Sequence, residues 1–443
     1  MKKISILLLS TLLIFTACNK DDEAEPASNP NSTTSNTDNG GNNSSTDTTT
    51  TDGGTIWEYN TEYNSCMQSL LILDANDNSY FVNKESGYIK NIYSIKKDGT
   101  LNWKIATDDV YSRDLMVVND KLFYLSGVNN PYGTPNTVRC YNTIDGSLLW
   151  TCDVSTGYQM AYSNNTLYVL VNVDNSNSAI ISVNPSSGAQ NWNQTLTGVC
   201  EASLRTNGTL LCVSANEIKY ENADNTGGVI MYNDNGSGAT ELWKWETVNY
   251  HTDRAIPFSI FDGNGNVFYA DFTNSTTKVK CFNQTNGNLN WETQVSGVSS
   301  YRSNIYYNNN RIFITYYDQA WSDIVMTNSI SVLNSTDGSI ISANNGILSQ
   351  QLPTDVYITG NNNFLEFNNN FTLNLHSESG SNILDYSFSY MSCNDLKITS
   401  EGNIIIQSND NGRIYCVKAS LVAPSTSSWA YFDGNAANTC GIN

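Results

Sequence analysis

Histidine is scarce in this chain of 443 residues, which contains only His251 and His376. Two histidines provide little material for a histidine-based metal site or a catalytic triad. Basic residues are also few: 22 Lys and Arg stand against 42 Asp and Glu, giving a formal net charge of −20. Because an acidic surface repels phosphate backbones and no basic cluster offsets it, we do not expect a nucleic-acid partner.

The chain also lacks the short motifs of common enzymes. It has no Gly-rich phosphate loop, no serine nucleophile elbow and no paired-carboxylate motif. Helical periodicity of useful length is absent, whereas Asn, Ser, Thr and Tyr are abundant and only 14% of residues are charged. This composition is typical of exported β proteins, and the lack of catalytic motifs leads us to expect a protein that is not an enzyme.

The amino terminus looks like a targeting segment. Lys2 and Lys3 precede an apolar run from Ile4 to Phe15, which is too short to span a bilayer and fits the core of a signal peptide. The following Thr16-Ala17-Cys18 resembles the lipobox of bacterial lipoproteins, which implies a signal peptide over residues 1–17 and a lipid on Cys18. The next five residues, 19–23, resemble the signal by which Bacteroidota export lipoproteins to the cell surface. An ordinary secretory signal with an incidental Cys is the alternative.

Residues 18–54 are predicted to form a tether. Beyond Cys18 they consist mostly of Asn, Ser, Thr, Asp and Gly, with almost nothing apolar. Such a segment cannot bury enough surface to offset the entropy lost on ordering, so we expect it to be disordered.

A short phrase, a turn Gly followed four positions later by Trp, recurs along the remainder of the chain. Clear copies end at Trp103, Trp150, Trp192 and Trp291, and a copy one residue longer ends at Trp243. Degenerate copies, which keep the Gly but lack the Trp, lie at 338–342 and 380–384. The spacing between successive copies gives repeating units of 42 to 51 residues. A fixed period of this length indicates stacked supersecondary modules that cannot bury their apolar faces alone.

Each unit reads as strand, tight turn, strand, loop, strand, tight turn, strand. The runs are short, rich in β-branched and aromatic residues, and bounded by Asn-Gly-type turns, as in a four-stranded propeller blade. Seven complete units are followed by three strands near 393–399, 403–407 and 413–418. An orphan copy of the phrase, Gly53 to Trp57, supplies the missing outer strand at Thr55 to Tyr59. We therefore predict an all-β, eight-bladed propeller of four-stranded antiparallel blades, closed by its N-terminal strand.

The segment Val138-Arg139-Cys140-Tyr141-Asn142, followed by Gly146 and Trp150, resembles the repeat of pyrroloquinoline-quinone-type (PQQ-like) propellers. The tail from Trp429 to Gly441 resembles the Trp-aromatic-Asn-Thr-Gly segment of many such proteins, although Cys440 interrupts it. The resemblance covers residues 55–443, with a C-terminal tail from about 420, and it implies the fold rather than an activity. Quinone-binding members use an adjacent Cys-Cys disulfide that this chain lacks, so we expect neither a cofactor nor a metal.

Two other patterns leave alternatives open. Cys140, Cys281 and Cys416 occupy one repeat position, which suggests small buried residues. Cys140 and Cys152 are also equidistant from Gly146, so a disulfide between them is possible if the hairpin is symmetric. Asp74 to Asn78 and Asp262 to Asn266 resemble the start of a Ca²⁺ loop, but both fall at the first turn of a blade, which favours a plain turn.

The insertions in the repeat all fall on one predicted face. They span 128–136, 215–227, 248–257 and 318–328, in second-to-third or blade-to-blade loops, whereas the first-to-second and third-to-fourth turns, which open on the other face, are uniformly tight. Variable loops on a rigid scaffold are a common place for recognition, and Trp, Tyr and Arg dominate binding hot spots. The candidate partner contacts are Tyr132, Tyr220, Tyr250, His251, Arg254 and Trp321. Solvated loops that cover neighbouring blades are the alternative.

These features predict a lipid-anchored propeller of the outer membrane, exposed at the cell surface, that binds an unidentified protein or glycan without catalysis. One alternative is an outer-membrane assembly factor that faces the periplasm. The other is an enzyme that acts on an extracellular polymer through carboxylates in the central channel.

Overall fold

A computed structural model of the chain describes residues 53–61, 71–84, 90–107, 111–127, 136–174, 176–218, 226–247, 259–271, 276–296, 303–318, 327–348, 356–368, 372–387, 393–408, 412–425 and 441–442. The chain divides into two units, residues 1–40 and 41–443, and every described residue belongs to the second. All helical or extended elements in these ranges are β-strands. The same ranges contain no helix long and apolar enough to cross a membrane.

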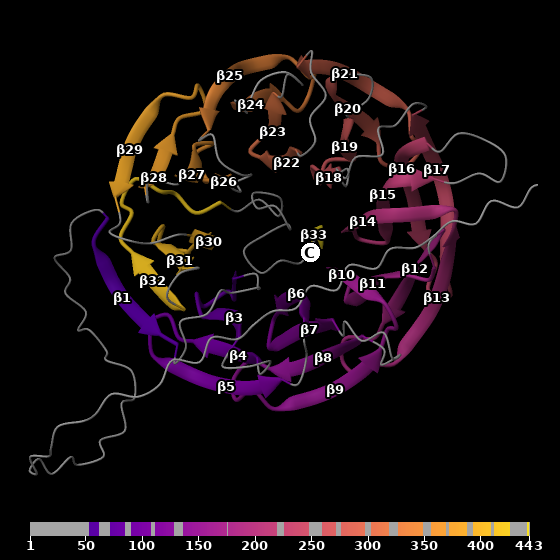
Figure 1. Cartoon of the computed structure of the whole chain (residues 1–443). Coiled ribbons are helices and arrows are strands. Elements are labelled where there is room, and N and C mark those ends of the chain that lie inside the picture. Colours follow the sequence, from indigo (N-terminus) through magenta and orange to yellow (C-terminus); the bar gives the residue numbers. More distant parts are fainter. Residues whose placement is uncertain are drawn as a thin grey trace, which may run out of the picture. The chain divides into compact units, whose positions relative to one another are not determined.

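The described strands form eight antiparallel blades arranged as a ring, which confirms the predicted propeller (Figure 1). Seven blades are built from four consecutive strands. The strands of the first three blades are β2 (Ile72–Leu73), β3 (Ser79–Lys84), β4 (Lys90–Ile95) and β5 (Leu101–Thr107); β6 (Tyr111–Val118), β7 (Lys121–Gly127), β8 (Thr137–Asn142) and β9 (Leu148–Asp153); and β10 (Gly157–Ser163), β11 (Thr166–Asn172), β12 (Asn177–Val183) and β13 (Gln190–Thr197).

The next four blades repeat the same order. Their strands are β14 (Val199–Asn207), β15 (Leu210–Ile218), β16 (Thr226–Asp234) and β17 (Ala239–Thr247); β18 (Ser259–Phe261), β19 (Asn266–Asp271), β20 (Thr277–Asn283) and β21 (Leu289–Ser296); β22 (Ser303–Asn308), β23 (Arg311–Asp318), β24 (Thr327–Asn334) and β25 (Ile340–Leu348); and β26 (Tyr357–Ile358), β27 (Phe364–Asn368), β28 (Thr372–His376) and β29 (Asn382–Ser387). Blade 4 differs from the prediction because a fifth strand, β33 (Gly441–Ile442), pairs with its innermost strand β14.

Blade 8 joins the two ends of the chain. Its three inner strands are β30 (Cys393–Ile398), β31 (Ile404–Ser408) and β32 (Arg413–Val417), and its outer strand is β1 (Thr55–Asn60). Trp57 pairs with Cys416, as a repeat Trp does in other blades. Ring closure by the N-terminal strand is therefore confirmed, and it removes a sheet edge that would otherwise be open for pairing.

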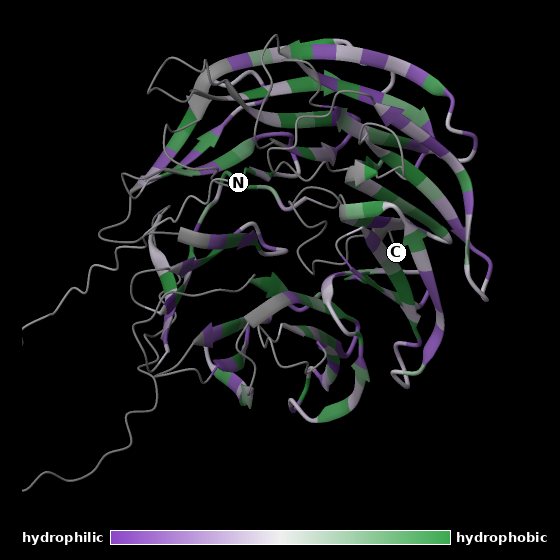
Figure 2. Cartoon of the chain, turned by 45° about the vertical axis from the view of Figure 1, so that its right-hand side comes forward, coloured by the Kyte–Doolittle hydropathy of each residue, from purple (hydrophilic) through white to green (hydrophobic). Residues whose placement is uncertain are grey.

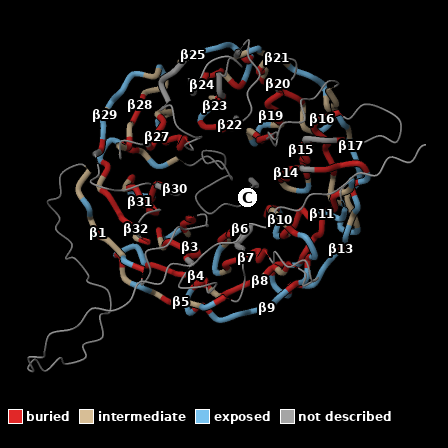
Figure 3. Tube along the Cα trace, viewed as in Figure 1, coloured by how far each residue is buried: buried red, intermediate tan, exposed pale blue. Residues whose placement is uncertain are grey.

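Burial increases from the outer strands toward the inner strands of the blades (Figure 3), and apolar residues are distributed over the strands of every blade (Figure 2). In the outer strand β9, Trp150 and Cys152 are buried between exposed neighbours, because one face of the outer strand meets the adjacent blade. Strands closer to the centre are sandwiched between two blades, and all five residues of β31 are buried. The core is thus a series of interblade layers.

The Gly-Trp phrase is the contact between successive blades. Trp103 donates from Nε1 to the carbonyl of Thr143 in the next blade, 2.8 Å away. A Cβ on Gly146 of that same turn would lie 2.9 Å from the Trp103 ring. Gly146 also has φ = +73°, a conformation that side chains disfavour. The repeat therefore consists of an indole on one blade and a side-chain-free turn on the next.

The turn in blade 2 corrects the predicted hairpin symmetry. Asn142 and Ser147 are hydrogen bonded, so the centre of the hairpin precedes Gly146. In the resulting register Cys140 faces Trp150, while Cys152 faces Val138. Both thiols are free, and the proposed disulfide is wrong.

The prediction that the cysteines at the repeat position are small buried residues is confirmed. Cys140, Cys281 and Cys416 are all buried, and each pairs with a repeat Trp across the outer two strands of its blade. These cysteines are therefore small core residues that lie opposite the repeat indoles.

The segments from Asp74 to Asn78 and from Asp262 to Asn266 connect the first and second strands of their blades, as the favoured interpretation predicted. Asp74 Oδ1 accepts hydrogen bonds from the backbone N–H groups of Asn76 and Asn78. Asp262 Oδ1 accepts equivalent bonds from Asn264 and Asn266. These carboxylates therefore organise their own turns.

Two predicted insertions are shorter than expected because the flanking strands extend into them. Strand β15 continues to Ile218 and β16 begins at Thr226, with a register shift between Ala215 and Ile218 that allows the longer ladder. In blade 6, β23 includes Asp318 and β24 begins at Thr327.

Candidate binding sites on the ring

The structure describes the strands that flank the predicted contact loops. The predicted residues themselves lie outside the described residues: Tyr132, Tyr220, Tyr250, His251, Arg254 and Trp321, together with Cys18. Their connections join β7 to β8, β15 to β16, β17 to β18 and β23 to β24. Since neighbouring strands are antiparallel, these strand ends lie on the face opposite the tight first-to-second turns. We call the two sides the insertion face and the tight-turn face.

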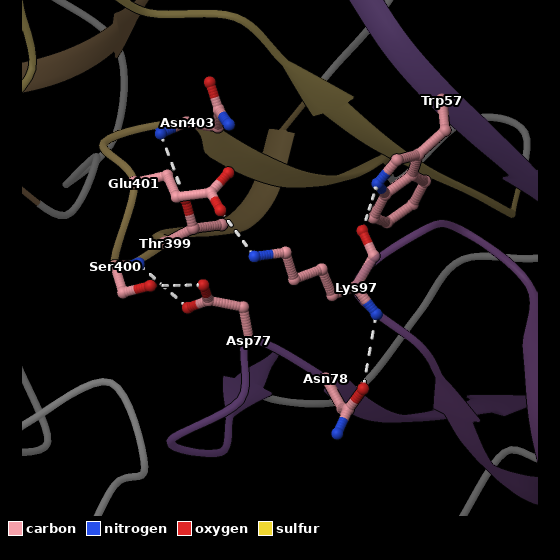
Figure 4. A network of polar contacts seen from close by, with 8 residues as sticks. All are labelled: Trp57, Asp77, Asn78, Lys97, Thr399, Ser400, Glu401 and Asn403. Carbon is pink, nitrogen blue, oxygen red and sulfur yellow. Dashed lines mark hydrogen bonds and ion pairs between the residues drawn. The ribbon is translucent and has the colours of Figure 1, made fainter. Parts of the chain in front are cut away.

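A pocket of about 210 Å³ lies on the tight-turn face between blades 8 and 1. Trp57, Ile405 and Cys416 contribute apolar surface, and Lys97 and Glu401 form an ion pair at its margin (Figure 4). The two charged side chains are more than half exposed. A pair this exposed adds little to stability.

Hydrogen bonds across the same seam join the two blades. Asp77 accepts from the backbone N–H of Ser400 at 2.8 Å and from its hydroxyl at 2.6 Å (Figure 4). Trp57 donates from Nε1 to the carbonyl of Lys97 at 2.9 Å. The polar groups of this pocket are thus engaged in closing the ring, and the geometry favours a structural role.

The protonation states in the pocket fit this role. Burial raises the pKa of the Cys416 thiol to about 12, so the thiol is protonated at neutral pH and is a poor nucleophile. The hydrogen bond to Glu401 raises the pKa of Lys97, and hydrogen bonds from Thr100 lower the pKa of Asp98. Neither shift prepares a general acid or base for neutral pH.

The inner edges of several blades are capped by side chains from the preceding blade. Asp114 of β6 accepts from the backbone N–H of Met160 in β10 at 2.7 Å. Gln159 of β10 accepts from the N–H of Leu204 in β14 at 2.8 Å.

The same device recurs where the ring closes. Asp395 of β30 accepts from the N–H of Leu71, at the start of blade 1, at 2.9 Å. The hydroxyl of Tyr357 in blade 7 accepts from the N–H of Leu396 in β30 at 3.2 Å. These caps satisfy N–H groups that an unpaired inner strand leaves open around the central channel.

A second Trp on β17, Trp245, is a site that the sequence reasoning missed. Its ring lies 4.8 Å from Lys280 Nζ, in cation–π contact across the junction of blades 4 and 5. Asp271 and Glu292 form ion pairs with the same ammonium group. Burial lowers the pKa of Lys280, and the charge of Asp271 opposes this shift. The sequence Trp243-Lys244-Trp245 could have indicated this site, because residues two apart in a strand lie on the same face.

His376 lies in β28 as a face-alternating residue, as predicted. It is buried, its ring stacks on Phe364 with centroids 5.0 Å apart, and its Nε2 lies 3.5 Å from Glu366 Oε2. Among the described residues, no cluster of three or more His, Cys, Asp or Glu side chains is arranged to hold a metal ion.

Comparison with known proteins identifies a related repeat family. Residues 134–317, from the region of blade 2 to blade 6, match the family described as outer membrane protein assembly factor BamB. The match covers less than half of the chain, and no curated protein matches it by sequence.

Solved structures share the fold. BamB from Moraxella catarrhalis is 10% identical with a TM-score of 0.55, and the alignment covers 83% of this chain and 98% of that one. The quinohemoprotein alcohol dehydrogenase ADHIIG from Pseudomonas putida HK5 is 9% identical with a TM-score of 0.56, covering 84% and 76%. The computationally designed Ika8 protein is 12% identical with a TM-score of 0.54, covering 81% and 98%. The chain therefore shares the β-propeller fold with these proteins, and at these identities the likeness extends no further.

Proposed function

We propose that this protein is a non-catalytic binding or scaffold module of the cell envelope that engages its partner through the insertion face. The observation that carries the proposal is the asymmetry of the ring. Tight, internally hydrogen-bonded turns occupy one face, and the longer connections, including the four that carry the predicted contacts, arise from strand ends on the other. A rigid scaffold that concentrates its sequence variation on one side is suited to recognition.

Anchoring to the outer membrane through a lipid on Cys18, with exposure at the cell surface, is the second part of the proposal. It rests on the lipobox-like sequence and the residues that follow it. The Cys18→Ala variant should leave the membrane fraction, while protease added to intact cells should digest the wild-type protein. Retention of the variant in the membrane contradicts the anchor.

The family match supports one alternative, an assembly factor that faces the periplasm. Protease shaving separates the two placements, because a periplasmic protein resists digestion until the outer membrane is permeabilised. An enzyme acting on an extracellular polymer would instead turn over a glycan that it binds.

Binding is tested by screening glycans and envelope proteins against the chain beginning at Asn19. For any ligand found, Trp321→Ala should weaken binding by roughly thirtyfold, as expected for truncation of a hot-spot Trp worth about 2 kcal/mol. Trp429→Ala, outside the four insertions, is the matched control. If Trp321→Ala lowers the melting temperature and leaves affinity unchanged, Trp321 is a packing residue and the insertion-face assignment is wrong.

A further inference from the structure

The inner edge of blade 4 is completed by backbone pairing. In β14, the N–H of Leu204 is capped by Gln159, but Thr206 and Asn207, two and three residues further toward the tight-turn face, pair with a strand. Gly441 and Ile442 lie parallel to Thr206 and Asn207, respectively. The inner edge of this blade therefore accepts an extended segment, and Figure 1 shows β33 inside the ring of blades.

The chain leaves blade 8 along the rim of the tight-turn face. A Cβ on Gly402 would lie 2.2 Å from the Val422 carbonyl oxygen, so the turn of blade 8 has to be glycine for the chain to pass. Gly360, in the turn of blade 7, donates its N–H to the Ala423 carbonyl at 2.7 Å. Ser425 then donates to Asn308 Oδ1, in blade 6, at 2.8 Å.

The rim contacts and the terminal strand differ in strength. The rim segment packs Val422 into the hydrophobic core between blades 7 and 8, with 4% of its surface exposed. The terminal strand holds only two register positions, whereas β14 is nine residues long. Because each net hydrogen bond contributes little, a ladder this short is easily displaced by a longer strand.

We propose that the inner edge of β14, from Leu204 to Asn207, is a strand-addition site for an extended peptide segment of another protein, and that the chain's own C-terminus occupies it until the partner displaces it. A partner strand longer than Gly441–Ile442 also pairs at Leu204 once the Gln159 side chain turns away. Backbone hydrogen bonds supply the affinity in this mode of recognition, and alternate side chains supply the selectivity.

This site belongs to the tight-turn face and to the central channel. It does not depend on the insertion face, so either proposal can fail while the other stands.

The test uses a labelled peptide with the sequence of residues 435–443, with Ser in place of Cys440, and fluorescence anisotropy with the full-length chain. The backbone groups of Leu204 and Thr206 face the inner edge, so in the parallel register the N–H of Ile442 is the donor that faces β14. The Ile442→Pro variant removes this donor from the internal strand and should free the site. The peptide should bind this variant at least about tenfold more tightly than wild type, because the tethered strand competes at millimolar effective concentration. A peptide carrying Pro at the position of Ile442 is the matched control and should not bind either protein.

A photoreactive group at the Ile442 position of the peptide should label the chain near Asn207. Equal binding to wild type and variant, binding of the proline peptide, or no binding to the variant overturns the proposal. A marked fall in the melting temperature of Ile442→Pro also overturns it, because the terminal strand would then be a structural part of blade 4. An unchanged melting temperature together with selective peptide binding supports the site.

Discussion

The backbone N–H of Gly53 donates to the carbonyl of Lys418 at 2.8 Å, and the N–H of Lys418 returns a bond to Gly54. The same pair of bonds closes the continuous turn of blade 1, from Gly99 to Lys96 and from Lys96 to Thr100. Blade 8 thus reproduces the hairpin of the other blades from two segments that are distant in sequence. Closure depends on side-chain packing and pairing rather than on a covalent turn.

This arrangement predicts that residues 55–60 are essential for stability and the preceding tether is not. A chain beginning at Thr61 loses the pairing of β1 with β32 and the burial of Trp57. Truncating a buried Trp alone typically costs about 3–5 kcal/mol, so calorimetry should show a clearly lower melting temperature. A chain beginning at Thr51 keeps β1 and should melt like wild type. Equal melting of the two truncated chains would refute closure by this strand.

Substitutions at two glycines with the same φ angle can distinguish the cost of backbone strain from the cost of overpacking. Gly99 and Gly236 both have φ = +85°, but a Cβ on Gly99 would lie 2.7 Å from the Trp57 ring, whereas nothing lies within 4 Å at Gly236. Gly236→Ala should cost about 1–2 kcal/mol of unfolding free energy from the left-handed conformation alone. Gly99→Ala should cost roughly 1–3 kcal/mol more, because it overpacks the seam.

The excess cost of Gly99→Ala should vanish in a Trp57→Ala background, since the indole it collides with is gone. Urea unfolding of the single and double variants measures this coupling. Additive costs would mean that the glycine is required for its backbone angle only.

Much of this seam follows from the sequence, because the Gly-Trp phrase is local and repeats in register. The side-chain caps do not follow in the same way. Asp114 and the N–H it binds at Met160 belong to different blades, and no spacing rule links one carboxylate to one backbone group. The strand at Gly441–Ile442 was also unpredictable, since two residues carry no periodic pattern. Lys280 beside Trp245 became evident only when blades 4 and 5 were placed together.

The buried thiols predict a loss of stability at high pH. Burial raises the pKa values of Cys140, Cys281 and Cys416 to about 12, above the value of roughly 8.5 in an unfolded chain. A raised native pKa of this kind stabilises the fold fully below the unfolded pKa, and this stabilisation is lost as pH rises toward 12. Urea midpoints should therefore fall between pH 8 and pH 10 by a smaller amount in Cys416→Ala than in wild type. An identical fall in both proteins would show that Cys416 does not contribute.

The last prediction concerns the side chains that cap the inner strands of the blades. Asp114→Ala leaves the N–H of Met160 without its 2.7 Å partner in a buried position, and an unsatisfied buried donor costs about 1–3 kcal/mol. Asp114→Asn keeps an acceptor oxygen and should cost less, because the amide can still bind the same N–H.

The matched control is Asp120→Ala in the neighbouring turn. The side chain of Asp120 is 63% exposed and forms an ion pair with Lys121, so its loss should change the unfolding free energy by less than about 0.5 kcal/mol. Hydrogen exchange at Met160 provides the local readout. It should accelerate in Asp114→Ala beyond the change in global stability, because the inner edge of blade 3 opens first. Unchanged exchange at Met160 would mean that this N–H finds another acceptor, and the capping role of Asp114 would be wrong.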